Sequence, residues 1–216
     1  MILSIDTTAE FGSIALAEGD RIVEEVLLRS PDGFGHVLFD RIRELLDRQA
    51  VKIGEVQCFA AASGPGSFTG VRVGLTAAKG LAFAGGKRVV PVSNLQALAF
   101  FGSAPLRATV TDARRGEVYA AVYNDRLELV QPELVIRFQD WLSELPDGEI
   151  EFIATDFAPF GALLESRIPV VTAPRALAGA IARIAWRRFE AGQTLDPAQV
   201  DANYVRRSDA ELFWKE

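Results

Sequence analysis

The sequence predicts an α/β protein built from two similar halves, each a mixed sheet with flanking helices. The first observation is a weak repeat: each half opens with an apolar strand ending in aspartate, then a strand led by glycine, then a turn into a third strand. The landmarks are Asp6, Gly12 and Asp20 in the first half and Asp112, Gly116 and Asp125 in the second. The second observation is that short apolar runs alternate with helical patterns after each repeat. We therefore expect one lobe over residues 1–104 and another over residues 105–216.

The first half alternates between strand and helix patterns. Strands are expected over 2–5, 13–17, 21–27, 58–62 and 89–92. The helix expected over 34–48 carries apolar residues at helical spacing, namely Leu38, Ile42, Leu45 and Leu46. A second helix is expected over 75–83 and a short one over 94–101, where Ser93 is a suitable N-cap.

The second half repeats this alternation. Strands are expected over 108–112, 117–123, 126–130, 150–154 and 169–172. Helices are expected over 138–145, 157–165 and 176–191, and the last of these is clearly amphipathic. Two such halves in tandem suit the actin-like ATPase (ASKHA) fold, which consists of two RNase H-like lobes. This is an analogy of architecture and carries no activity by itself.

The composition is that of an ordinary soluble chain of 216 residues, 49% hydrophobic and 24% charged. A net charge of −6 and a pI near 5.0 argue against a chain that holds nucleic acid by itself. Cys58 is the sole cysteine and lies in an apolar run, which fits a buried thiol in a reducing compartment. The N-terminus lacks a signal-peptide pattern and no apolar run is long enough to span a bilayer. We expect a cytoplasmic protein without a membrane partner.

A glycine-rich stretch between the strand at 58–62 and the following helix is the most distinctive motif, and it reads SGPGSFTGVRVG. Gly64 and Gly66 tolerate positive φ and carry no Cβ, and free N–H groups at a helix start favour an anion. The spacing is neither the dinucleotide-binding pattern nor the P-loop pattern. One interpretation is therefore an anion or nucleotide site at Gly64 and Gly66, and the other is a turn that only packs.

Two aspartates end equivalent strands of the repeat. Asp6 and Asp112 would suit a site for Mg²⁺ and a nucleotide if the two halves faced each other, and Thr7 would then be close to phosphate. Aspartates at strand ends also cap turns by accepting hydrogen bonds from backbone N–H groups. Both interpretations are open for Asp6, and turn capping is favoured for Asp112.

The sequence gives little sign of catalysis. His36 is the single histidine, so a site built on a histidine pair is excluded, and no metal site is expected. The Gly-x-Ser-x-Gly nucleophile pattern does not occur. We therefore expect no catalytic residues in this chain.

The helix after the glycine-rich stretch is apolar nearly all round. Small residues keep part of its surface flat, namely Gly70, Gly74, Ala77 and Ala78. Such a helix is either buried within its own chain or shares one face with a partner. On the second interpretation, Gly74→Glu would leave the fold intact and abolish partner binding, whereas unfolding would indicate a core face.

Several blocks resemble the bacterial TsaB (YeaZ-type) family, whose members are subunits in threonylcarbamoyladenosine (t6A) modification of tRNA. The glycine-rich stretch at 63–75 and the block DARRGEVY at 112–119 are the most specific. The opening strand with Asp6 to Thr8, the segment 92–99 and the segment 203–206 are also similar. The resemblance covers essentially the whole chain and implies the actin-like fold, without the paired-histidine metal motif of the paralogous transferase TsaD.

The resemblance also implies an interface. In the family, the first helix and the helix after the glycine loop pair the subunit with itself or with TsaD. The corresponding residues are His36, Phe39, Arg43, Ser67, Phe68, Thr69, Val71, Arg72, Gly74 and Leu75. TsaE, a P-loop ATPase, is a further implied partner, with ATP or ADP near the subunit junction and no cofactor required by this chain. The tRNA would be met only through the complex.

The expected function is thus that of a non-catalytic dimerisation and scaffold subunit. TsaD would require it to transfer a threonylcarbamoyl group to N6 of adenosine 37 in tRNAs that read ANN codons. The rival from another class is an autonomous actin-fold ATPase or small-molecule kinase that uses Asp6, Thr7 and Asp112.

Overall fold

The computed structural model of the chain describes residues 1–160, 164 and 169–205. The helix expected over 157–165 lies partly outside these residues, and Arg206 lies wholly outside them. The chain divides into two compact units. Unit 1 comprises Met1–Ala97 and Arg175–Ala202, and unit 2 comprises Leu98–Pro174 with described residues 203–205.

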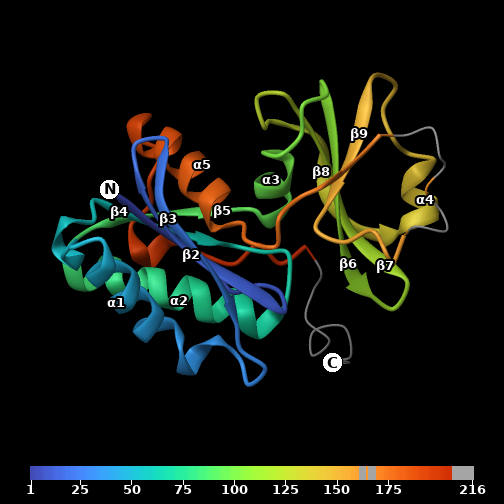
Figure 1. The fold of residues 1–216 in the computed structure, drawn as a ribbon. Helices are drawn as coiled ribbons and strands as arrows, with labels where there is room; N and C mark the ends of the chain where they lie inside the picture. Colours follow the sequence, from blue (N-terminus) through green and yellow to red (C-terminus); the bar gives the residue numbers. More distant parts are fainter. Residues whose placement is uncertain (161–163, 165–168, 206–216) are drawn as a thin grey trace, which may run out of the picture. The chain divides into compact units, whose positions relative to one another are not determined.

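Unit 1 is organised around a five-stranded mixed sheet in the order β3-β2-β1-β4-β5 (Figure 1). Its strands are β1 (Ile2–Asp6), β2 (Phe11–Glu18), β3 (Arg21–Arg29), β4 (Cys58–Ala62) and β5 (Arg88–Val92). β1 pairs antiparallel with β2 and parallel with β4. Every residue of β1 and β4 is buried, as expected for central strands with both faces covered.

Helices cover both faces of this sheet. α1 (Leu38–Arg48) and α2 (Phe68–Gly85) lie on one face, and α5 (Ala178–Glu190) lies on the other (Figure 1). The 3₁₀ turns η1 (Phe34–His36), η2 (Ile53–Glu55) and η3 (Pro197–Gln199) complete the unit. The apolar stripe expected on the first helix is confirmed, because Leu38, Ile42, Leu45 and Leu46 are all buried in the core.

Unit 2 has a second five-stranded sheet in the order β10-β9-β6-β7-β8. Its strands are β6 (Leu106–Arg114), β7 (Glu117–Asn124), β8 (Leu129–Arg137), β9 (Ile150–Ala154) and β10 (Val170–Thr172). The short helix α4 (Phe138–Leu142) packs Phe138 and Trp141 against Phe152 in an aromatic core. The helix α3 (Asn94–Ala99) precedes β6 in the chain.

The predicted fold class is confirmed, and the repeat is visible in the topology. Each sheet consists of a three-stranded antiparallel meander extended by two parallel strands, in matching order. Several bounds differ from the prediction, most clearly those of α2 and β8. α2 begins at Phe68 rather than at residue 75, because Ser67 caps the earlier turn by accepting a hydrogen bond from the Gly70 N–H. β8 runs to Arg137 instead of ending at residue 130.

The predicted boundary also needs correction at its C-terminal side. Residues 175–202 were assigned to the second lobe by chain order, but they belong to unit 1. The physical reason is the buried stripe of α5, which includes Ile181, Ile184 and Ala185. This stripe covers the sheet face that α1 and α2 leave open, so the chain returns to complete the core of unit 1.

Candidate functional site

The glycine-rich stretch packs against a turn of its own chain. Gly66, Gly70 and Gly74 face Thr7 and Thr8, which follow β1. A Cβ at Gly66 would lie 2.7 Å from the Thr8 carbonyl oxygen, and one at Gly74 would lie 2.7 Å from Thr7 Oγ1. A Cβ at Gly70 would overlap the Thr7 carbonyl oxygen. The glycines therefore permit close packing of a backbone, and that backbone is the Thr7–Thr8 turn.

Hydrogen bonds fix this contact. Thr7 Oγ1 donates to the Gly70 carbonyl oxygen at 2.7 Å. The Ser67 N–H donates to the Thr8 carbonyl oxygen at 2.7 Å, and the Val71 N–H donates to the Ser67 carbonyl oxygen at 2.8 Å. The N–H groups of Ser67, Gly70 and Val71 thus have partners within the chain, and the geometry favours the packing interpretation of the loop over an anion site.

Asp6 belongs to the same buried network. Its Oδ1 accepts hydrogen bonds from the Thr8 N–H at 3.0 Å and the Thr8 hydroxyl at 2.7 Å. The Asn94 side chain donates to Thr8 Oγ1 at 2.6 Å and accepts from the Gly64 N–H at 3.1 Å. Burial raises the pKa of the Asp6 carboxyl, and the bonds from Thr8 and Asn94 oppose that shift. Asp6, Thr7 and Gly64 are all buried, so they serve the interior of unit 1 in this structure.

Asp112 has a different environment. It is exposed in unit 2, where its Oδ1 accepts a hydrogen bond from the Arg114 N–H at 2.7 Å. The Arg114 guanidinium lies 3.6 Å from the other carboxylate oxygen. This bond caps the β6–β7 turn, where Arg114, Arg115 and Gly116 all have positive φ. The turn-capping interpretation of Asp112 therefore accounts for its geometry.

The surface of unit 1 carries an apolar groove between α1 and α2, with a volume of about 460 Å³. The residues that line it are Gly35, Leu38, Phe39, Phe68, Thr69, Arg72, Val73, Thr76 and Ala77. Two phenyl rings stand out from its walls, since Phe39 is 56% exposed and Phe68 is 43% exposed. The Arg72 guanidinium lies 3.7 Å from the centroid of the Phe68 ring, a cation–π contact that holds the ring at the rim. We call these lining residues the α1–α2 groove.

The predicted interface residues divide into two groups. The exposed group consists of His36, Phe39, Arg43, Ser67, Phe68, Thr69 and Arg72. The other three, Val71, Gly74 and Leu75, are buried within unit 1, and a role for them in contacts with a partner stays a prediction. The cause is the orientation of α2: its small-residue face packs on β1 and the Thr7–Thr8 turn, not on the outside. The expectation that Gly74→Glu would leave the fold intact is corrected for the same reason.

Sequence reasoning missed other residues of this surface. Val73 and Thr76 line the groove, and Phe83 further along α2 is 82% exposed. Thr76 lies four residues after Arg72, and Phe83 lies seven residues after Thr76, which is the spacing of one helix face. That spacing could have predicted the exposed face of α2, but the continuous apolar run of this helix made the face hard to recognise.

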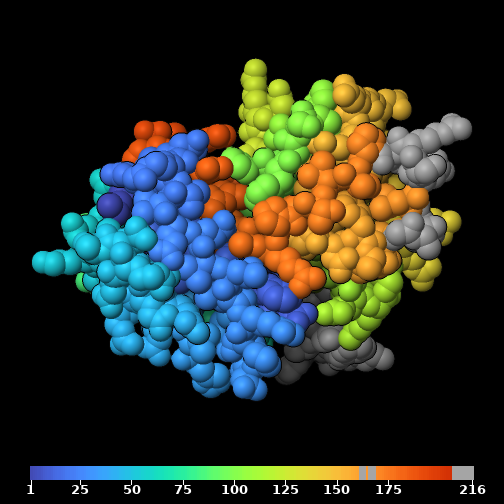
Figure 2. All heavy atoms as spheres, in the orientation of Figure 1, coloured from blue at the N-terminus to red at the C-terminus, as the bar shows by residue number. Residues whose placement is uncertain are grey.

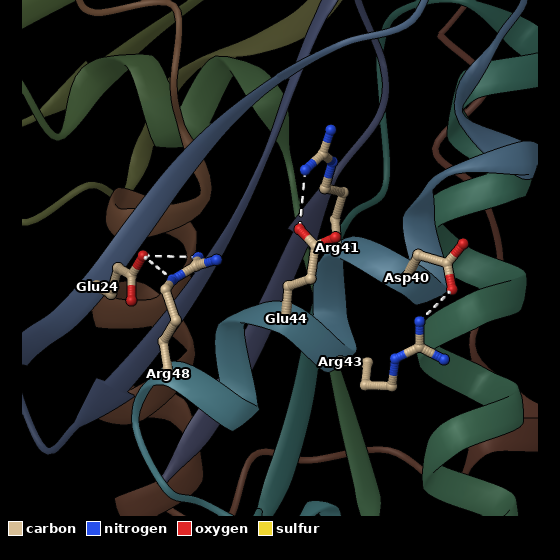
Figure 3. Close-up of polar contacts among 6 residues, drawn as sticks. All are labelled: Glu24, Asp40, Arg41, Arg43, Glu44 and Arg48. Atoms are coloured by element: carbon tan, nitrogen blue, oxygen red, sulfur yellow. Dashed lines mark hydrogen bonds and ion pairs between the residues drawn. The ribbon is translucent and has the colours of Figure 1, made fainter.

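Beside the groove, α1 presents a charged outer surface. Arg41 pairs with Glu44 at 2.8 Å, Arg43 with Asp40 at 3.0 Å, and Arg48 with Glu24 at 2.7 Å. Figure 3 shows these three pairs as dashed lines. In the space-filling view, α1 lies on the open lower left of unit 1 (Figure 2). Exposed pairs of this kind contribute only about 0–1 kcal/mol each. Arg43 is therefore free to exchange its partner for one on another molecule at little cost.

Metal-ligating residues do not gather in the described part of the chain. Among residues 1–160, 164 and 169–205, no group of three or more His, Cys, Asp or Glu side chains is placed to hold a metal ion. His36 is exposed at the end of η1.

None of the helices in the described part of the chain has the length and apolar character that a membrane span requires.

Comparisons with known proteins identify the family. The family model described as "TsaD: tRNA N6-adenosine threonylcarbamoyltransferase" matches residues 35–167. The chain is 30% identical to the tRNA threonylcarbamoyladenosine biosynthesis protein TsaB of Bacillus subtilis, over 100% of this chain and 98% of that protein. It is also 33% identical to a tRNA N6-adenosine threonylcarbamoyltransferase of Rhizobium leguminosarum, over 68% of this chain and 44% of that protein.

Solved structures agree with the sequence comparisons. YeaZ from Pseudomonas aeruginosa superposes with a TM-score of 0.83 at 26% identity, over 94% of this chain and 98% of that one. Similarity in both sequence and fold thus extends over essentially the full chain. The chain belongs to the TsaB family of tRNA threonylcarbamoyladenosine biosynthesis proteins.

Proposed function

We propose that this chain acts in t6A biosynthesis as a non-catalytic subunit that docks onto a TsaD-type transferase through the α1–α2 groove. TsaD would need this docked subunit to transfer the threonylcarbamoyl group to N6 of adenosine 37 in tRNAs that read ANN codons. The names of the TsaB relatives support the pathway, and the similarity to a named transferase supports the class of partner. The chain would work in the cytoplasm and meet tRNA only as part of the complex.

The observation that carries this proposal is the exposure of Phe39 and Phe68 on the two walls of one groove. Large apolar side chains grouped on adjacent helices are typical of a surface that a partner covers. Helices of a partner can pack into such a groove by fitting their ridges between α1 and α2. The exposed charges of Arg43 and Asp40 lie on α1 beside this apolar centre, as expected for the rim of an interface.

The similarity of the chain to both TsaB and TsaD proteins suggests how the partner is held. Two related lobes can present the same helix pair to each other across an approximate twofold axis. The same surface would then serve a homodimer of this chain when TsaD is absent. TsaE would join the complex as its ATPase, with ATP or ADP near the subunit junction rather than as a cofactor of this chain.

The state of the Asp6 turn supports a non-catalytic role. An actin-fold ATPase or kinase would need Asp6 and Thr7 to reach a nucleotide, but both side chains are buried and bonded within unit 1. Thr7 and Thr8 also pack against the glycines and fill the space that a phosphate would need beside the loop backbone. The rival function therefore loses two of its three candidate residues.

A reconstituted reaction tests the proposal. TsaD and TsaE of the same organism are supplied with tRNA and preformed threonylcarbamoyl-adenylate, with and without this chain, and t6A is measured. We expect t6A only when the chain is present and none from the chain alone. Equal t6A formation without the chain would contradict the scaffold role. Mg²⁺-dependent ATP hydrolysis by the chain alone, lost in Asp6→Ala, would instead support the rival.

A further inference from the structure

We infer that the Thr7–Thr8 turn positions α2, and with it the α1–α2 groove, so that Thr7 is a positioning residue for partner docking. The effect of Thr7 on partner affinity rests on the proposed function. The effect of Thr7 on the position of α2 depends only on the structure of unit 1. Thr7 and Thr8 do not line the groove, so they would act on docking only through α2.

Thr7 contacts α2 at two successive turns. Its hydroxyl donates to the Gly70 carbonyl oxygen at 2.7 Å, and its Oγ1 occupies the space that a side chain at Gly74 would need. Thr7 is only 1% exposed. Because this contact joins a buried hydrogen bond to close packing, we expect a change at Thr7 to shift the first turns of the helix.

Further hydrogen bonds hold the Thr7–Thr8 turn in place. Thr8 is bonded through its N–H and hydroxyl to Asp6, and its hydroxyl also accepts from Asn94. Asn94 in turn exchanges backbone and side-chain hydrogen bonds with Gly64, at the other end of the glycine stretch. The start of α2 is thereby fixed between two points of one polar network.

The groove depends on this placement. Phe68 and Arg72 lie two residues on either side of Gly70, and their side chains form the α2 wall. The opposite wall comes from α1, which is anchored in the core of unit 1 by the buried Leu38, Ile42 and Leu45. A shift of the first turns of α2 therefore changes the spacing between Phe39 and Phe68, the two residues that the partner would contact.

Variants of Thr7 and Ser4 separate positioning from general stability. Ser4 is a matched control, because it lies on β1, three residues before Thr7, and its hydroxyl donates to the Ala178 carbonyl oxygen at 2.7 Å, on the α5 side of the sheet. Thr7→Val and Ser4→Ala each remove one buried hydroxyl donor, although the Ser4 hydroxyl also lies 3.3 Å from the Ala15 carbonyl oxygen. Thr7→Ser retains the hydroxyl. Affinity for TsaD is measured alongside urea unfolding for each variant. We expect Thr7→Val to weaken binding about tenfold, with Thr7→Ser and Ser4→Ala within about twofold of the wild type.

A distance measurement tests the cause without a partner. Spin labels are placed at Arg43→Cys on α1 and Thr76→Cys on α2, and their separation is measured by pulsed electron paramagnetic resonance. Burial raises the pKa of the Cys58 thiol to about 11, so the native cysteine stays unlabelled near neutral pH. We expect the distance distribution to shift or broaden in Thr7→Val, and to match the wild type in Thr7→Ser and Ser4→Ala.

The outcomes distinguish the two proposals. An unchanged label distance in Thr7→Val, or an equal change in Ser4→Ala, would overturn the positioning role whatever the affinities are. A shifted distance in Thr7→Val alone supports it. Failure of the unmodified chain to bind TsaD would contradict the proposed function, while the distances would still decide whether Thr7 positions α2.

Discussion

The turn after β1 and the turn at the end of β6 arise from the same sequence landmark, yet they have opposite environments. Asp6 is 2% exposed and holds Thr8 inside unit 1, whereas Asp112 is exposed and caps a hairpin of unit 2. The difference comes from what packs against each turn. In unit 1 the glycines of α2 close over Thr7 and Thr8. A repeated aspartate therefore indicates an equivalent position in the fold, but its neighbours decide its role.

The largest expected effect comes from the glycines that enclose the unit 1 turn. Gly70→Ala places a Cβ against the Thr7 carbonyl oxygen, which is backbone and cannot rotate away. We expect a loss of about 3 kcal/mol or more in the free energy of unfolding, measured with urea. Gly80→Ala on the same helix is the control, since nothing lies within 4 Å of its added Cβ. That variant should gain about 0.5–1 kcal/mol, and similar losses in both variants would contradict the packing account.

A smaller effect separates the two aspartates directly. Asp6→Ala leaves the buried Thr8 N–H without its acceptor and disturbs the Asn94 side chain, so we expect a loss of about 2–3 kcal/mol. Asp112→Ala removes an exposed turn cap and should cost about 0.5–1 kcal/mol. Urea unfolding of both variants measures the difference. Equal costs would show that the two turns are equivalent after all.

The pH dependence of stability sharpens the same contrast. Burial raises the pKa of Asp6 above its ordinary value of 3.8, so the folded chain keeps this proton at a pH where the unfolded chain has lost it. The corresponding stability is present at low pH and is lost as the pH rises from the ordinary value to the raised one. We expect Asp6→Asn to flatten the fall in stability that begins as the pH rises through the ordinary carboxyl pKa.

Glu25 provides the control for that titration. Burial also raises its pKa, against the opposing hydrogen bond from the Gly179 N–H and the charge of Arg183. The Asp6 charge also raises the pKa of Glu25, and Glu25 is exposed at the surface, where solvent screens its charge. Glu25→Gln should therefore flatten the slope less than Asp6→Asn does. A slope that steepens in Asp6→Asn would mean that the folded chain favours the ionised carboxyl.

The sequence was sufficient for the fold and for part of the surface. The repeat around Asp6 and Asp112 predicted two meander sheets in matching order, and the spacing of Leu38, Ile42 and Leu45 predicted the buried face of α1. The return of α5 to unit 1 was not predicted, because amphipathic spacing shows that a helix has a buried face but not which sheet it covers.

The orientation of α2 is the feature of the site that could not be predicted from the sequence. Gly70, Gly74 and Ala78 suggested a flat face for a partner, but a flat face serves equally well against a turn of the same chain. Only the position of Thr7 and Thr8, more than sixty residues earlier in the chain, decides between them. Once that face is fixed, Phe68, Arg72 and Thr76 necessarily point outward, and the groove follows.

The most direct test of the docking claim compares two pairs of exposed apolar residues. Phe39 and Phe68 are 56% and 43% exposed in the groove, and Leu129 and Val130 are 55% and 47% exposed on β8 of unit 2. Affinity for TsaD is measured for Phe39→Ser with Phe68→Ser and for Leu129→Ser with Val130→Ser, with folding checked by urea unfolding. We predict that the groove pair weakens binding at least about thirtyfold and the β8 pair less than about twofold. Full affinity in the folded groove variant, or loss confined to the β8 variant, would contradict docking through α1 and α2.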